Sequence, residues 1–122
     1  RRNFYKGDAK KAYKKNKLVK NSFNKLVIYR NSIIVDCLFG IGLNRKINGI
    51  YKKIIKKVNK SKQYIISIDI PSGINGNTGE KMGEAIKANL TYALHAKKDG
   101  HTIGMGKKYS GKVKVVDIGI KE

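Results

Sequence analysis

One stretch of the sequence constrains the fold more than any other: two apolar runs with an amphipathic segment between them, from residue 32 to residue 69. The runs Ser32 to Asp36 and Tyr64 to Asp69 show no polar alternation, which is typical of strands buried on both faces of a parallel sheet. Residues 48–60 place apolar side chains at helical spacing with lysines opposite, which predicts an amphipathic helix. Strand, helix and strand within about 35 residues form a βαβ unit, and its right-handed crossover makes the strands parallel.

The rest of the chain predicts further elements of the same kind. Residues 8–20 are rich in Ala and Lys and predict an exposed helix, and Leu26 to Tyr29 predicts a short strand. Leu90 to Leu94 and Val113 to Asp117 predict two more strands, with a glycine-rich loop between them. We therefore expect a single α/β domain with a mostly parallel sheet.

The charge of the chain is strongly positive, with 28 basic and 8 acidic side chains and a net charge of +20. Such a charge is compatible with nucleic-acid binding, but nearly all of it comes from Lys, which reads phosphate and guanine less specifically than Arg. Lys, Asn and Ile all have AT-rich codons, so base composition explains much of the excess. The lysines of residues 48–60 suit a phosphate backbone or an anionic lipid, and we favour a solvated outer face instead. We expect no specific nucleic-acid partner.

Several classes of protein are excluded or disfavoured by what the sequence lacks. No apolar stretch approaches the roughly 20 residues needed to cross a bilayer, and no secretory segment follows the first residues. The single cysteine, Cys37, excludes an internal disulfide framework and a multi-cysteine zinc site, and we expect it in the core. We therefore expect a cytoplasmic protein with no membrane partner.

Three of the five aspartates, Asp36, Asp69 and Asp117, each close an apolar run. The carboxyl ends of parallel strands form the crevice in which open α/β sheets bind ligands. Glycine-containing loops follow Asp36 and Asp69, so these two residues predict a small-molecule site. Each of them also fits a plain structural role as a helix cap or turn residue, and for Asp117 we favour that role.

Familiar catalytic and cofactor motifs are missing. The pair Gly40 and Gly42 lacks the third glycine of a dinucleotide fingerprint, and no P-loop occurs. Ser72 lacks the flanking glycines of a nucleophile elbow. His95 and His101 have no third ligand at zinc spacing.

Three blocks of sequence together resemble the NAD(P)H-hydrate epimerase family, the YjeF N-terminal domain. The blocks are residues 35–45 (VDCLFGIGLNR), 67–76 (SIDIPSGING) and 111–120 (GKVKVVDIGI), and they match in order and spacing. Lys98, Gly100 and His101 also resemble the family's Lys-Pro-Gly loop, with Asp99 in place of the proline. The resemblance implies a Rossmann-like three-layer αβα sandwich with a mostly parallel sheet.

The resemblance also implies an activity and a site. Members of the family interconvert the R and S forms of hydrated NADH or NADPH, and a potassium ion sits in their site. Asp36 and Ser72 match the potassium ligands, and Asp69 matches the residue that contacts the reactive ring. The loop that covers the substrate phosphates matches Gly40, Ile41, Gly42, Leu43, Asn44, Arg45 and Lys46. Oxygen ligands from such turns suit a hard cation, and a glycine loop lets backbone N–H groups approach a pyrophosphate.

We expect Asp69 to act as the proton shuttle of the epimerisation. A carboxyl at a strand end can pass a proton to the departing ring hydroxyl and help water return from the other face, while the ring nitrogen supplies electrons. Asp69 also belongs to the expected substrate-binding residues.

The chain departs from the family at its N-terminal end. The family's Asn-Asn-Gly-Gly-Asp-Gly loop, which gives a further potassium ligand, has no counterpart before Gly7. We therefore expect residues 1–122 to be the C-terminal part of the domain, truncated at the N-terminus and of uncertain activity alone. The alternatives are an RNA-associated scaffold module of the same fold or an inactive remnant. The resemblance also allows a homodimer and, in a longer parent, a fused NAD(P)H-hydrate dehydratase.

Overall fold

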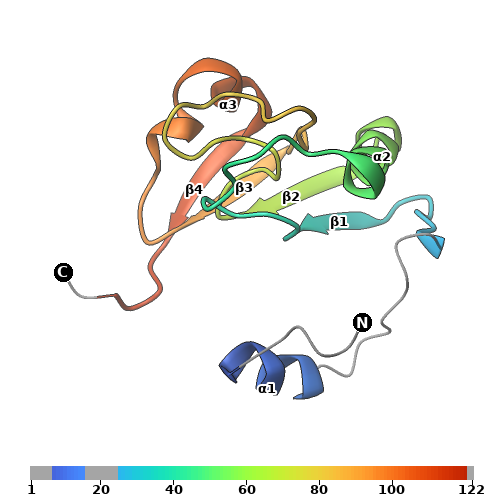
Figure 1. Cartoon of the computed structure of the whole chain (residues 1–122), viewed down its shortest axis with the longest axis horizontal. Helices are drawn as coiled ribbons and strands as arrows, with labels where there is room; N and C mark the ends of the chain where they lie inside the picture. Colours follow the sequence, from blue (N-terminus) through green and yellow to red (C-terminus); the bar gives the residue numbers. More distant parts are fainter. Residues whose placement is uncertain (1–6, 16–24, 121–122) are drawn as a thin grey trace.

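A computed structural model of the chain describes residues 7–15 and 25–120, and within them four strands form one sheet (Figure 1). The sheet has the order β1-β2-β3-β4, and each strand pairs with its neighbours in parallel. The predicted parallel α/β arrangement is thereby confirmed. Along the chain the elements are α1 (Gly7–Lys15), β1 (Ile33–Asp36), α2 (Gly49–Lys60), β2 (Tyr64–Ile68), β3 (Leu90–Leu94), η2 (Asp99–His101), α3 (Gly104–Tyr109) and β4 (Lys112–Val116).

The predicted βαβ unit is confirmed as β1, α2 and β2. Helix α2 begins directly after Asn48 and buries Ile54, Ile55 and Val58 of its predicted apolar face, whereas Ile50 and Tyr51 of that face are 40% and 38% exposed. These three side chains join Ile65 of β2 in the main core cluster. Full burial of each such side chain stabilises the fold by about 1.5–3 kcal/mol. The helix is therefore held by its apolar face.

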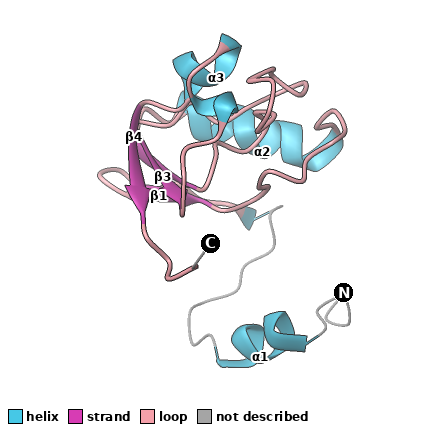
Figure 2. Ribbon diagram, turned by 90° about the vertical axis from the view of Figure 1, so that its left-hand side faces the viewer, coloured by secondary structure: helices cyan, strands magenta, loops and turns pink. Residues whose placement is uncertain are grey.

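The two faces of the sheet differ in what covers them. On the face toward α2 and α3, Ser67, Thr91 and Ala93 are fully buried. On the opposite face, Ile33 and Val35 of β1 are 65% and 57% exposed. Figure 2 shows α2 and α3 on the same side of the sheet, with α1 apart from it. Within residues 7–15 and 25–120, the third layer of the expected sandwich is not seen, and the expected burial of β1 on both faces is wrong.

The expected strand Leu26 to Tyr29 is wrong, because this segment does not join the sheet. Leu26 and Ile28 pack against the main core, whereas Val27 and Tyr29 are 62% and 73% exposed. The ammonium group of Lys57 in α2 donates a hydrogen bond to the carbonyl oxygen of Leu26. The alternating burial of residues 26–29 thus arises from packing against a helix, although the same pattern in the sequence is typical of a strand.

The other predicted boundaries hold to within a few residues. Helix α1 starts one residue before the predicted helix, and residues 16–20 of that prediction lie outside the described residues. Strand β4 covers Lys112–Val116, so Asp117 directly follows it. Among the described helices, none is long and apolar enough to cross a bilayer.

Candidate functional site

The candidate site lies where the loops after β1, β2 and β3 meet. Because the strands are parallel, their carboxyl ends share one edge of the sheet, as the open-sheet rule requires. Asp36 is the last residue of β1 and Asp69 follows β2. Lys98 comes from the loop after β3. The fold therefore brings residues from three separate loops together.

Asp36 and Ser72 form the buried part of this site, with exposures of 4% and 1%. Oδ1 of Asp36 accepts a hydrogen bond of 2.6 Å from the Ser72 hydroxyl, and Oδ2 accepts one of 2.8 Å from the Ser72 backbone N–H. Oδ2 also accepts a bond of 2.9 Å from the hydroxyl of Ser67, and Oδ1 accepts one from the backbone N–H of Leu38. A carboxylate so satisfied is stable inside a protein.

The oxygen atoms around Ser72 suit part of a cation shell. The Ser72 hydroxyl oxygen lies 2.6 Å from Oδ1 of Asp36 and 3.2 Å from the carbonyl oxygen of Phe39. One hydroxyl hydrogen serves only one of these two acceptors at a time. The three oxygens are hard ligands of the kind that potassium and other hard cations prefer. No cluster of three or more His, Cys, Asp or Glu side chains suited to a metal occurs in the described ranges.

Asp69 sits just beyond β2 in a left-handed conformation with φ of 69°. Its Oδ1 forms an ion pair with the ammonium group of Lys98. His101, which is 3% exposed, places Nε2 at 2.7 Å from the carbonyl oxygen of Asp69 and accepts the Lys98 backbone N–H on Nδ1. Since Nδ1 is an acceptor, Nε2 carries the hydrogen and donates it to Asp69.

The loop Gly40 to Lys46 begins beside Asp69. A Cβ atom added to Gly40 would lie 3.9 Å from Oδ2 of Asp69, and the backbone N–H of Phe39 donates to the Ser72 hydroxyl at 2.9 Å. Beside the loop lies a hollow of about 390 Å³. It is lined by Leu38, Phe39, Gly40, Gly42, Leu43, Asn44 and Arg45.

The predicted loop residues differ in what they offer a ligand. The side chain of Leu43 belongs to the core and is 9% exposed. The exposed members are Gly40, Ile41, Gly42, Asn44, Arg45 and Lys46. A second hollow, of about 240 Å³, is lined by Arg45 and Lys46 together with Tyr51. Two cations beside a glycine loop favour an anionic ligand group.

Two residues weighed in the sequence, Asp117 and Cys37, have other places in the structure, and a third, His101, joins the site. Asp117 accepts a hydrogen bond of 2.8 Å from the backbone N–H of Gly119, which is the turn role that we favoured. Cys37 is exposed, so its expected place in the core is wrong. The thiol is still partly buried, and this burial, followed by the nearby Asp36 carboxylate, raises its pKa. His101 belongs to the site although its distance from other histidines gave no reason to include it.

Lys98 is the neighbour of Asp69 that the sequence motifs did not assign to the site. The only signal for it was its place in the block that resembles the Lys-Pro-Gly loop. A sequence motif cannot show that this ammonium group reaches a carboxylate 29 positions earlier in the chain.

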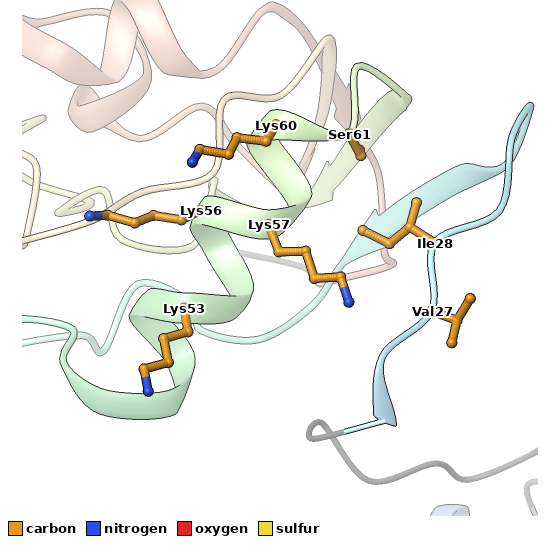
Figure 3. Close-up of a pocket in the computed structure, with 7 residues that line it drawn as sticks. All are labelled: Val27, Ile28, Lys53, Lys56, Lys57, Lys60 and Ser61. Carbon is orange, nitrogen blue, oxygen red and sulfur yellow. The ribbon is translucent and has the colours of Figure 1, made fainter.

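A larger hollow, of about 640 Å³, lies between α2 and the segment of Val27 and Ile28. Figure 3 shows Lys57 pointing toward these two residues, while Lys53, Lys56 and Lys60 point away from them. The ammonium groups therefore do not converge on one point, which an anion site requires.

Comparison with known proteins finds related sequences. The sequence profile of the family described as YjeF-related protein N-terminus matches residues 5–100. An NAD(P)H-hydrate epimerase of Lentilactobacillus buchneri is 49% identical over 87 residues, which are 71% of this chain and 40% of that protein. One of Weissella koreensis is 43% identical over 98 residues, or 80% of this chain and 44% of that protein.

A longer relative matches as well. The bifunctional NAD(P)H-hydrate repair enzyme Nnr of Coxiella burnetii is 36% identical over 100 residues, which are 82% of this chain and 20% of that protein. The chain thus spans about two fifths of the length of the curated epimerases it matches and less of the bifunctional enzyme.

Proposed function

Because the chain belongs to the family of the YjeF-related protein N-terminus, which is Rossmann-like, we propose that it is the C-terminal part of an NAD(P)H-hydrate epimerase domain. The activity is the interconversion of the R and S forms of hydrated NADH or NADPH. The observation that carries this proposal is the meeting of Asp69, the Gly40 loop and the Asp36–Ser72 pair at one edge of the sheet. In a longer parent, the same domain precedes a dehydratase, as the relationship to the bifunctional enzyme supports.

We expect the substrate to lie along this edge with its pyrophosphate at the loop and its ring at Asp69. Its pyrophosphate is anionic and lies along the loop from Gly40 to Lys46, where Arg45 and Lys46 supply positive charge. The backbone of Gly40 and Gly42 carries no side chain, so a phosphate approaches it closely; no heavy atom lies within 4 Å of a Cβ position on Gly42. The hydrated ring then reaches Asp69, whose Oδ2 is next to Gly40.

Potassium is the cofactor that we assign to the oxygen cluster. Asp36, Ser72 and the carbonyl of Phe39 would hold it. When bound, the ion supplies a fixed positive charge next to the substrate loop. The residues of this chain bind the phosphates, and Asp69 serves as the proton-transfer group.

Asp69 exchanges the proton in the reaction. The ring nitrogen of the hydrate pushes its electron pair toward the carbon that bears the hydroxyl, and a proton passes through Asp69 to that hydroxyl, which departs as water. Water then adds to the opposite face of the ring and returns one proton to the Asp69 carboxylate. Atoms and charge balance over the cycle, and only the configuration at the carbon changes.

The test follows the epimer ratio of NADPH hydrate enriched in one form, measured by liquid chromatography with and without the chain. We expect the chain to speed the approach to equilibrium and Asp69→Asn to fall to the protein-free rate. Asn tolerates the left-handed backbone of this position, so Asp69→Asn keeps the far-UV circular dichroism of the wild type. Turnover that survives in Asp69→Asn excludes Asp69 as the proton shuttle.

A further inference from the structure

Lys98 is tied to Asp69 more closely than a surface lysine would be. Its ammonium group pairs with Oδ1 of Asp69 and also donates a hydrogen bond of 2.8 Å to the carbonyl oxygen of Leu94. The side chains of Lys98 and Asp69 are only 22% and 19% exposed. Burial of this extent reduces screening by water, so the two charges interact more strongly than an exposed pair.

The two carboxylate oxygens of Asp69 have different surroundings. Oδ1 faces Lys98, whereas Oδ2 faces the start of the loop that covers the substrate, 3.9 Å from the Cβ position of Gly40. A carboxyl group that rotates freely would exchange these oxygens. The ion pair on one side therefore selects which oxygen the substrate meets.

His101 in turn fixes Lys98. Its imidazole accepts the backbone N–H of Lys98 at 2.9 Å and donates to the carbonyl oxygen of Asp69 at 2.7 Å. The ring is 3% exposed, so these bonds compete with little water. The two loops that carry the ion pair are thus joined by a buried bridge.

We propose that Lys98 is a positioning residue of the epimerisation: it holds Oδ1 of Asp69, directs Oδ2 at the substrate ring, and balances the carboxylate charge. This inference rests on the proposed function. When Oδ2 of Asp69 gives its proton to the departing hydroxyl, the carboxylate forms beside the ammonium group of Lys98. When water adds, Oδ2 takes a proton back. Lys98 keeps its three hydrogens throughout, so it acts through Asp69 and touches no reacting atom.

The test removes the ammonium group and then returns it. We expect Lys98→Ala to lower kcat by on the order of a hundredfold, as the loss of one preorganised charge partner does, with KM changed by less than about threefold. Ethylammonium chloride added to Lys98→Ala should restore part of kcat, whereas ethanol, a neutral molecule of similar size, should not. Lys97→Ala is the matched control, because Lys97 is the exposed neighbour, and it should keep the wild-type kcat.

A second measurement needs no turnover. In the chain labelled with ¹³C, the Asp69 carboxyl resonance should move in Lys98→Met, which keeps an unbranched apolar side chain of similar length, and stay in place in Lys97→Met. If Lys98→Ala does not fold, Lys98→Met serves for the kinetic comparison as well. Circular dichroism checks the fold of each variant.

The outcomes separate this inference from the proposed function. A wild-type chain that leaves the epimer ratio at the protein-free rate overturns the proposed function and the inference with it. An active wild type whose folded Lys98 variants keep kcat, or recover equally with ethanol, overturns the inference alone. An unmoved Asp69 resonance in Lys98→Met overturns it too.

Discussion

The hydroxyl of Ser72 lies 2.6 Å from Oδ1 of Asp36, although the two residues are 36 positions apart in the chain. This bond closes the loop after β2 onto the end of β1. The backbone N–H of Phe39 also donates to the Ser72 hydroxyl. The pair therefore stabilises the fold and at the same time shapes the proposed cation site.

Replacing Asp36 by Ala should lower the free energy of unfolding, because it leaves the Ser67 hydroxyl and the Ser72 N–H buried without their acceptor. Each such loss costs roughly 1–3 kcal/mol. Urea unfolding followed by circular dichroism measures the change. Asp117→Ala is the control, since Asp117 is exposed at its turn and its loss should cost much less. Equal effects of the two substitutions would contradict the structural role of Asp36.

Potassium should raise the thermal unfolding midpoint, because a ligand that binds only the folded state stabilises it. The comparison is between potassium chloride and choline chloride at equal ionic strength, which keeps general screening the same. The difference should disappear in Asp36→Asn, which keeps the shape of the side chain and removes its charge. A potassium effect that persists in Asp36→Asn places the ion elsewhere.

Gly73→Ala should destabilise the fold strongly. Gly73 has φ of +97°, and a Cβ atom at this position would lie 2.1 Å from the carbonyl oxygen of Glu84, which is backbone and cannot rotate away. An alanine in an incompatible conformation of this kind costs more than about 1 kcal/mol. Gly42→Ala is the matched comparison, because its Cβ meets no atom within 4 Å. Chemical unfolding should give Gly73→Ala a free energy of unfolding well below that of Gly42→Ala.

The thiol of Cys37 should react slowly with iodoacetamide near neutral pH. Burial, and then the Asp36 carboxylate, raise its pKa in the folded chain above the ordinary value of a cysteine thiol, so less of the reactive thiolate is present. Alkylation rates measured across the alkaline range should therefore reach their midpoint at a higher pH in the folded chain than in the urea-unfolded chain. Asp36→Asn should move this midpoint down, because one of the two causes is removed.

The same shift affects stability with a definite sign. A raised pKa in the folded state means that the folded chain holds the Cys37 proton more tightly than the unfolded chain does. The stability that this tighter proton binding adds is fully present below the pKa of Cys37 in the unfolded chain. It is lost as the pH rises through the pKa of Cys37 in the folded chain. Cys37→Ala should remove that part of the alkaline decline in stability, as unfolding curves across the alkaline range would show.

Regular elements were predictable because their patterns are local. Three buried positions at helical spacing define α2, and continuous apolar runs define β1, β2 and β3. The segment Leu26 to Tyr29 failed because alternate burial arises equally from pairing in a sheet and from packing beside a helix. Only the neighbours in space distinguish these two causes.

The sequence by itself determined that this chain forms a parallel α/β sheet with Asp36 and Asp69 at its carboxyl edge, since strand pattern and strand ends are written along the chain. Tertiary structure alone decided which atoms meet there. The ion pair between Lys98 and Asp69 spans 29 positions, and His101 reaches Asp69 across 32. Such contacts depend on the path of three loops, which no local spacing encodes, and they decide which oxygen of Asp69 faces Lys98.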